Sequence, residues 1–331
     1  MNSYQRYMAM IRGEPVDHLP RVPILMHFAV RYAGVSYADF ARDAQVLVDA
    51  NRRLVSDFGF DQLDSMCDPW RETADFGAPL EYQADTIPRC EPPLADTKDL
   101  SKLARPDPLE SERMKNAVRI VQGYKELAWQ EYSITGWVEG PAAEASDLRG
   151  VAGFMVDLLD DEGFACELMD LCLDNAIRFA RAQVAEGADT IGVGDSVCSQ
   201  ISPGLYERLV VPRQKQLFDA IHDAGGLVRL HICGDTNRIM PQIATLGVDI
   251  LDCDWQVDMP EARQIVGPKV ALAGNLDPVS AVMQSTPEEI RDSFRKIYRQ
   301  VGRPYFITAG CEIPADTPHE NLRALCEPIP A

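Results

Sequence analysis

Eight short apolar runs, most of them rich in β-branched residues, recur along the 331-residue chain and are separated by longer segments of helical periodicity. Strands that are each followed by a helix pair in parallel, because the helix returns the chain to the same end of the sheet. Eight such units in a chain of this length predict an α/β fold, a (β/α)8 barrel. The predicted strands are Val22–Met26, Phe60–Leu63, Tyr132–Val138, Thr190–Val193, Leu227–Ile232, Val248–Leu251, Val270–Ala273 and Tyr305–Ala309.

The segments between the runs carry apolar residues at intervals of three and four, which indicates amphipathic helices. Pro287–Val301 follows the strong start signal Ser285-Thr286-Pro287-Glu288-Glu289. The other predicted helices are Ala38–Phe58, Leu109–Trp129, Glu162–Ala188, Leu205–Ala224, Thr236–Leu246 and Met259–Val266.

We expect a single barrel domain over residues 1–331. An N-terminal helix is expected within residues 1–20, where Tyr4, Met8 and Ile11 share one helical face. A segment rich in proline and charge, at about residues 77–108, is expected as an irregular insertion over the barrel mouth.

Composition narrows the classes of function. The formal net charge of −19 disfavours nucleic acids and anionic membranes as partners. No apolar run approaches the roughly 20 residues of a membrane span, and no signal segment opens the chain, so we expect a cytoplasmic protein. The nine cysteines are an odd number scattered over a long chain, which favours reduced thiols or metal ligands over a disulfide framework.

A barrel of this kind holds its active site at the carboxyl ends of the strands, and polar residues gather there in this sequence. Polar loops with Asp or Asn as helix caps give an alternative explanation for members such as Asp195 and Asp277. That explanation does not extend to cysteine and histidine, which are not favoured caps. The residues that follow the predicted strands are His27, Asp64, Asp68, Glu139, Asp195, His231, Cys233, Asp252, Asp254, Asn275, Asp277, Cys311 and Glu312.

His231 and Cys233 are two residues apart at the end of a strand, so their side chains point to the same side. A third soft ligand at Cys311 would complete a His/Cys/Cys set with one open position, as in catalytic zinc sites. The alternative for a His-x-Cys pair on a strand is ordinary core packing. Since Cys311 follows the eighth strand, a metal bound by the set would either lie across the mouth or be reached by a loop at residues 310–317.

Several blocks resemble the uroporphyrinogen decarboxylase superfamily, whose fold is a (β/α)8 barrel. The resemblance rests on Leu251–Asp258 with Ala262-Arg263, on Val270–Pro278, on Ile201-Ser202-Pro203 followed by Tyr206, and on Ile313–Pro318. Porphyrinogen decarboxylases carry Met-Arg-Gln-Ala-Gly-Arg-Tyr after the first strand, where this chain has Met26–Tyr32 with Arg31 alone. They also carry Gly-His-Gly after the eighth strand, where this chain has Gly310-Cys311-Glu312.

The chain is more similar to the corrinoid-dependent branch, the methylcobalamin:coenzyme M-type methyltransferases. Their zinc motif is His-x-Cys followed far downstream by Cys, and His231, Cys233 and Cys311 match it. The resemblance implies Zn²⁺ as cofactor and a methyl group that moves between methylcobalamin on a separate corrinoid protein and a small thiol or folate-type acceptor. The identity of the acceptor, the direction of transfer, the fourth zinc ligand and the oligomeric state are left open.

The remaining candidate residues receive expected roles from their places after the strands. Glu139 is a candidate catalytic residue, as a fourth ligand or a partner of His231, and Asp195 is a second catalytic candidate. His27, Arg31, Asp64 and Asn275 are candidate substrate-binding residues, with Arg31 as the anchor of an anionic tail. Two alternatives are a metal-free decarboxylase that uses Asp64 or Asp68 as its acid, and a non-catalytic protein that binds a corrinoid or tetrapyrrole.

Overall fold

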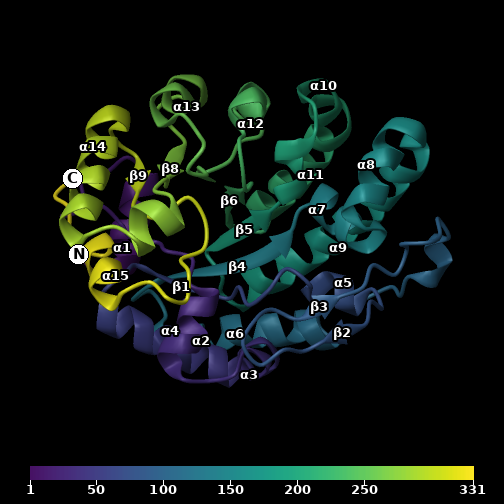
Figure 1. The fold of residues 1–331 in the computed structure, drawn as a ribbon, viewed down its shortest axis with the longest axis horizontal. Helices are drawn as coiled ribbons and strands as arrows, with labels where there is room; N and C mark the ends of the chain where they lie inside the picture. Colours follow the sequence, from purple (N-terminus) through teal and green to yellow (C-terminus); the bar gives the residue numbers. More distant parts are fainter.

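Seven parallel strands form a curled sheet in the computed structural model, which describes residues 1–331. Each strand pairs with its neighbour in parallel, and helices surround the sheet (Figure 1). The predicted (β/α)8 barrel is confirmed. In their order around the ring the strands are β1 (Gln62–Asp64), β4 (Ser133–Glu139), β5 (Thr190–Gly194), β6 (Leu227–His231), β7 (Ile250–Asp252), β8 (Ala271–Ala273) and β9 (Tyr305–Phe306).

An extended segment around Arg21 occupies the eighth position of the ring, between β9 and β1. Arg21 forms a parallel bridge with Ile307, and the Val22 amide donates to the Ile307 carbonyl at 2.9 Å. On the other side, the Asp61 amide donates to the Arg21 carbonyl at 2.8 Å. The segment therefore hydrogen-bonds to both edges of the sheet and closes the barrel.

The predicted strand Val22–Met26 is wrong in its extent. Pro20 and Pro23 flank the bridge and have no N–H group to donate, so the ladder of hydrogen bonds cannot continue past them. The helix α2 (Met26–Ala33) then begins at the residue that was expected to end the strand.

The predicted helices Met259–Val266 and Pro287–Val301 are confirmed as α13 and α14. Ala38–Phe58 is instead two helices, because the Asp43 carboxylate accepts from the amide of Gln45 and starts a second one. No helix combines the length and the apolar character that crossing a bilayer requires. The other helices are α3 (Tyr37–Arg42), α4 (Ala44–Phe58), α5 (Arg71–Asp75), α6 (Glu112–Ala128), α7 (Pro141–Arg149), α8 (Val151–Asp160), α9 (Glu162–Glu186), α10 (Pro203–Leu205), α11 (Val211–Asp223), α12 (Met240–Ile243) and α15 (His319–Leu325).

The N-terminal helix α1 (Ser3–Ile11) packs against the barrel through a different face from the one expected. Arg6, Tyr7 and Met10 are buried, whereas the predicted face of Tyr4, Met8 and Ile11 is only half-buried. The Tyr7 hydroxyl lies 3.1 Å from the Thr190 hydroxyl at the start of β5. Polar contacts to the amino ends of the strands therefore determine which face of α1 is buried.

The segment at residues 77–108 is more ordered than expected. It contains a short antiparallel pair, β2 (Leu80–Glu81) and β3 (Arg89–Cys90), and the single-turn helix η1 (Leu100–Lys102). Ile87, between β2 and β3, lines the cavity at the carboxyl ends of the barrel strands.

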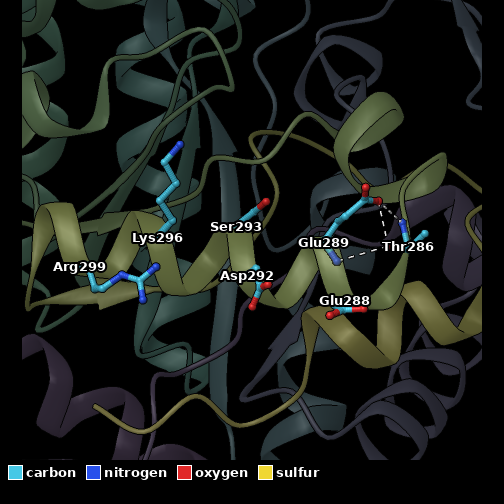
Figure 2. A pocket seen from close by; sticks show the side chains of 7 residues that line it. All are labelled: Thr286, Glu288, Glu289, Asp292, Ser293, Lys296 and Arg299. Carbon is cyan, nitrogen blue, oxygen red and sulfur yellow. Dashed lines mark hydrogen bonds between the residues drawn. The ribbon is translucent and has the colours of Figure 1, made fainter.

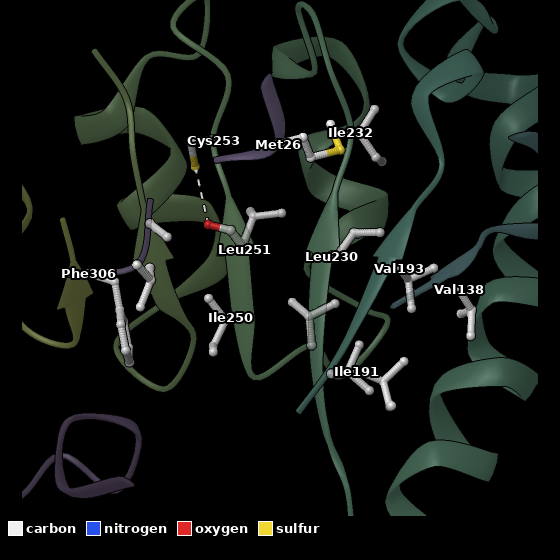
Figure 3. Packing of buried hydrophobic residues seen from close by; sticks show 14 of the residues in the cluster. Met26, Val138, Ile191, Val193, Leu230, Ile232, Ile250, Leu251, Cys253 and Phe306 are labelled. Atoms are coloured by element: carbon white, nitrogen blue, oxygen red, sulfur yellow. Dashed lines mark hydrogen bonds between the residues drawn. The ribbon is translucent and has the colours of Figure 1, made fainter. Parts of the chain in front are cut away.

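The strands are apolar on the face that meets the helices and largely polar on the face that lines the barrel. Ile191, Val193 and Leu230 belong to the apolar layer between sheet and helices (Figure 3). Inside the barrel, Gly192 gives room to Trp137, since a Cβ atom at Gly192 would lie 2.4 Å from the indole ring. Gly194 lies in the same way against the Glu139 carboxylate, at 3.3 Å.

One buried carboxylate contacts the segment that closes the barrel, so we expect its loss to reduce the free energy of unfolding strongly. Asp61 is fully buried and accepts from Arg6 Nη1 at 2.6 Å and from Arg21 Nε at 2.9 Å. We expect Asp61→Asn to lower the free energy of unfolding by about 3 kcal/mol in urea titrations, because a buried guanidinium loses its counter-ion.

The exposed pair of Arg12 and Glu14 provides the control for this variant. Glu14→Gln should leave the free energy of unfolding nearly unchanged, because a solvent-exposed ion pair contributes little. Equal losses for the two variants would contradict the role assigned to Asp61.

Candidate metal centre at the barrel mouth

His231, Cys233 and Cys311 converge at the carboxyl end of the barrel, and their ligand atoms all lie within 4.8 Å of one another. His231 Nε2 lies 3.2 Å from Cys233 Sγ and 3.8 Å from Cys311 Sγ, and the two sulfur atoms are 3.7 Å apart. This separation is far longer than the roughly 2.05 Å of a disulfide bond. One nitrogen and two sulfur donors at this spacing fit a soft divalent cation such as zinc.

Cys311 reaches this position on a loop that crosses the mouth from β9. The Gly310 amide donates to the Leu276 carbonyl at 2.8 Å, and the Ile313 amide donates to the Ile24 carbonyl at 3.0 Å. A Cβ atom at Gly310 would lie 2.4 Å from the backbone nitrogen of Trp255, so only glycine allows this approach. These contacts bring Cys311 to residues of β6 that are not neighbours of β9 in the sheet.

Cys233 is held by the turn that follows β6. Gly234 adopts a φ of +92°, a conformation that other residues rarely adopt. Its amide donates to Asp254 Oδ2 at 2.9 Å, which ties this turn to the loop after β7.

His231 is oriented from behind by a buried ion pair. Asp252 Oδ2 lies 3.2 Å from His231 Nδ1, and Arg229 Nε lies 2.9 Å from both carboxylate oxygens of Asp252. Arg229 also donates to Gln62 Oε1 at 2.8 Å. With Nδ1 engaged by Asp252, Nε2 faces the two sulfur atoms. Asp252, and not Glu139, is therefore the partner of His231.

Arg229 was missed in the sequence, where its only signal is a cation within the apolar run Leu227–Ile232. Asp252 was noted for its place after a strand but received no role.

The three side chains of the cluster shift one another's pKa values. The hydrogen bond from Cys233 lowers the pKa of Cys311 to about 4, against the opposing effect of burial. The same hydrogen bond raises the pKa of Cys233. Burial acts to lower the pKa of His231, but the interactions with Cys233 and the hydrogen bond with Asp252 raise it.

A cavity of about 260 Å³ opens beside the three candidate ligands. Of the other candidate residues, His27 and Glu139 line this cavity, whereas Arg31, Asp64, Asp195 and Asn275 do not. The lining residues are Ile24, Met26, His27, Met66, Pro69, Ile87, Glu139, Gly194, Ser196, His231, Cys233, Cys311 and Glu312.

Arg31 and Asn275 are engaged elsewhere. Arg31 forms an ion pair with Asp316, and both side chains are exposed to solvent. Asn275 Nδ2 donates to the carbonyl oxygens of Asp254 at 3.1 Å and of Val257 at 2.9 Å, so it holds the loop after β7.

The carboxylates of Asp64 and Asp195 accept hydrogen bonds from nearby groups of the chain and do not line the cavity. Asp64 accepts from the amide of Met66 at 2.7 Å and faces a separate, smaller cavity. Asp195 is fully buried and accepts from the Ala143 amide at 2.7 Å and from Gln214 Nε2 at 2.8 Å. Asp195 therefore positions α7 and does not touch the cavity.

Glu139 belongs to a buried group of carboxyl side chains behind the cavity. Its amide donates to Glu72 Oε1 at 2.8 Å, and Arg71 Nη2 lies 3.9 Å from Glu139 Oε1. Burial raises the pKa of Glu139 well above its usual range, and the carboxylate of Glu72 raises it further. Glu144 and Asp147 are shifted in the same direction, mainly by burial.

A second, wider depression runs along α14 and differs from this cavity in the composition of its lining. Its lining is entirely polar and open to solvent, and Thr286 with Glu289 forms the capping box of the helix (Figure 2). We interpret it as the solvated face of an amphipathic helix. The lining residues are Thr286, Glu288, Glu289, Asp292, Ser293, Lys296 and Arg299.

Relatives with known names match along almost the whole chain. The methylcobamide:CoM methyltransferase MtbA of Methanosarcina mazei is 28% identical over 334 residues, which cover 98% of this chain and 96% of the relative. A uroporphyrinogen decarboxylase of Carboxydothermus hydrogenoformans is 27% identical over 331 residues, which cover 95% of this chain and 93% of the relative. The chain is thus similar to members of both branches considered from the sequence.

Among solved structures, a methyltransferase from Methanosarcina mazei superposes with a TM-score of 0.89 at 22% identity. The superposition covers 98% of this chain and 97% of the other, and it supports the barrel fold. The sequence profile described as uroporphyrinogen decarboxylase (URO-D) matches residues 2–330. The chain therefore belongs to the uroporphyrinogen decarboxylase (URO-D) family.

Proposed function

We propose that this chain is a zinc-dependent methyltransferase that moves a methyl group between a corrinoid protein and a small thiol. The observation that carries the proposal is the convergence of His231 Nε2, Cys233 Sγ and Cys311 Sγ beside a cavity at the barrel mouth. The similarity to a relative named as a methylcobamide:CoM methyltransferase supports it. A cavity of about 260 Å³ lies below the roughly 300–1,000 Å³ of sites for drug-sized ligands. We therefore favour a small thiol over a folate.

His231, Cys233 and Cys311 are the residues that would hold the zinc ion. When bound, zinc lowers the pKa of a thiol in its open position and presents the sulfur as a nucleophile. Transfer to the thiol forms an S–CH3 bond, breaks the Co–CH3 bond of methylcobalamin with its electron pair left on cobalt, and releases the thiol proton.

The chain's own residues orient the ligands and limit access of water. Asp252 fixes the ring of His231, and Arg229 fixes Asp252. The apolar side chains of Met26, Met66 and Ile87 line part of the cavity, and we propose that they limit the access of water. We retain Glu139 as the candidate catalytic carboxyl group, since it lines the cavity, and we assign Asp195 a positioning role.

The corrinoid is expected on a separate protein that docks over the mouth. Two large apolar side chains on the loops after β7 and β8 are exposed, Trp255 at 51% and Val279 at 44%. The Trp255 backbone contacts Gly310, next to Cys311, so this surface adjoins the candidate metal centre. We propose that these side chains contribute to the docking surface.

The metal-free decarboxylase alternative finds little support in the cavity. A porphyrinogen with several carboxylates needs cationic partners, yet no Arg or Lys lines the cavity. Asp64 faces elsewhere, and Asp68 is ion-paired with Arg113. The lining of the cavity therefore favours methyl transfer over metal-free decarboxylation.

Removal of one ligand should abolish stoichiometric metal binding. We expect the purified protein to contain one zinc per chain. Cys311→Ser should weaken zinc binding by more than about 100-fold, which exceeds the effect of losing a residue that only orients a ligand. Elemental analysis and competition with a chromogenic chelator measure this. Cys166→Ser, which changes a thiol outside the cluster, is the control and should keep its zinc.

The loop that carries Cys311 provides a second test, which leaves every ligand in place. We expect Gly310→Ala to weaken zinc binding by about 10-fold or more, because the new Cβ atom pushes the loop away from Trp255. Gly204→Ala is the matched control, since a Cβ atom there meets nothing within 4 Å. Unchanged zinc affinity in Gly310→Ala would show that the loop is not needed to place Cys311.

Methyl transfer itself is tested by following the absorbance of methylcobalamin with a panel of thiols and folates. We expect a thiol to convert methylcobalamin to cob(I)alamin, and a chelator to stop the reaction until zinc is restored. Full activity of a metal-free protein would refute the zinc dependence. If no acceptor consumed methylcobalamin and no donor methylated cob(I)alamin, the assignment as a methyltransferase would fail.

A further inference from the structure

The cavity beside the candidate metal centre has a lining without any Arg or Lys side chain. Its lining contains the carboxyl groups of Glu139 and Glu312, and Ile24, Met26, Met66, Pro69 and Ile87 contribute an apolar surface. An anionic group on the tail of a ligand, away from the candidate metal ligands, would lose water in such a site without gaining an Arg or Lys partner, which is unfavourable at low dielectric constant.

Two positive groups near the mouth, Arg31 and His27, are paired with carboxylates of the chain. Arg31, the expected anchor for an anionic tail, is exposed and paired with Asp316. The imidazole of His27 lies 2.8 Å from Glu312, so the histidine of the rim has a counter-ion of its own.

The nearby helix N-termini are occupied in the same way. The backbone amide of His27, in the first turn of α2, donates to Glu312 Oε1 at 2.7 Å. The amide of Ala143, in the first turn of α7, donates to Asp195 Oδ1 at 2.7 Å. Free N–H groups at a helix N-terminus are a common anion site, and here these two are engaged by the chain's own carboxylates.

Two buried arginines lie beneath the site, but neither lines the cavity. Arg229 is held by Asp252 and Gln62. Arg71 lies behind Glu139, 3.9 Å from this carboxyl group and 3.9 Å from that of Glu72. The net charge of −19 further lowers the local concentration of anions.

From this distribution of charge we infer that the thiol which this cavity accepts is small and uncharged, with an apolar tail in place of a sulfonate or carboxylate. This inference rests on the proposed function and specifies its substrate class. It separates this chain from its methylcobamide:CoM methyltransferase relative by the acceptor, since coenzyme M carries a sulfonate. Ile87 and Met66 form the wall that would contact the tail of such a thiol.

The test measures thiol binding directly, without methyl transfer. Cobalt(II) replaces zinc, and the increase of the sulfur-to-cobalt absorption band above that given by Cys233 and Cys311 reports each bound thiol. The panel is 1-propanethiol, 2-mercaptoethanol, 2-mercaptoethanesulfonate and cysteamine, compared at equal thiolate concentrations. We expect 1-propanethiol to bind at least about 10-fold more tightly than the sulfonate, which is the size of effect given by one missing charged contact.

The possible results are distinct. Equal or tighter binding of the sulfonate overturns the inference and leaves the proposed methyltransferase intact. Tighter binding of the cationic cysteamine also overturns it. If cobalt binds but no thiol gives a signal, the proposed function fails together with the inference.

A charge variant probes the wall itself. We expect Ile87→Lys to shift the preference toward 2-mercaptoethanesulfonate by about 10-fold, because it supplies the missing cation. Leu159→Lys adds the same charge on α8, where Leu159 is 72% exposed and outside the cavity, and it should leave the preference unchanged. Equal shifts in both variants would mean that overall charge, and not the cavity wall, sets the preference.

Discussion

The ion pair of Arg229 and Asp252 in the barrel interior is the interaction on which the candidate site depends. Arg229 is fully buried, and its guanidinium group contacts both oxygens of Asp252 and the amide of Gln62, which links three strands. A buried charge is tolerated only where its partners are held in good geometry. The same carboxylate also contacts His231, so the ion pair that holds Asp252 in place also fixes the orientation of this candidate metal ligand.

The fold was largely predictable, because the alternation of apolar runs and helical segments is a global property that tolerates local errors. The errors arose where a single residue determines where a strand or helix begins or ends. Pro20 and Pro23 reduce the first strand to a single bridge, and the Asp43 cap divides one predicted helix into two. For α1, the buried face follows from polar contacts of Arg6 and Tyr7, which apolar periodicity does not reveal.

The candidate site was predictable to a smaller degree. The period of two along a strand placed His231 and Cys233 on one side, and the resemblance to a family supplied Cys311. A place after a strand does not specify where a side chain points, however. Asn275 follows its strand as expected but holds the carbonyl groups of its neighbouring loop, and Arg31 points to solvent. Polar groups near a barrel mouth must first satisfy the backbone of their own loops, and this requirement is invisible in a single sequence.

The two glycines of β5 affect the shape of the cavity beside the candidate metal centre. Gly192 and Gly194 leave the inner side of this strand without side chains in two successive layers. Trp137 fills the lower space, and the upper space remains open beside Glu139 and His231. The cavity lining therefore includes the backbone of Gly194 as well as the side chains of Met26 and Met66, so a bound molecule would meet a fixed peptide group and flexible methionine side chains. Such a lining combines a fixed surface with an adaptable one, which would allow the tail of a ligand to vary while its reacting atom keeps one position.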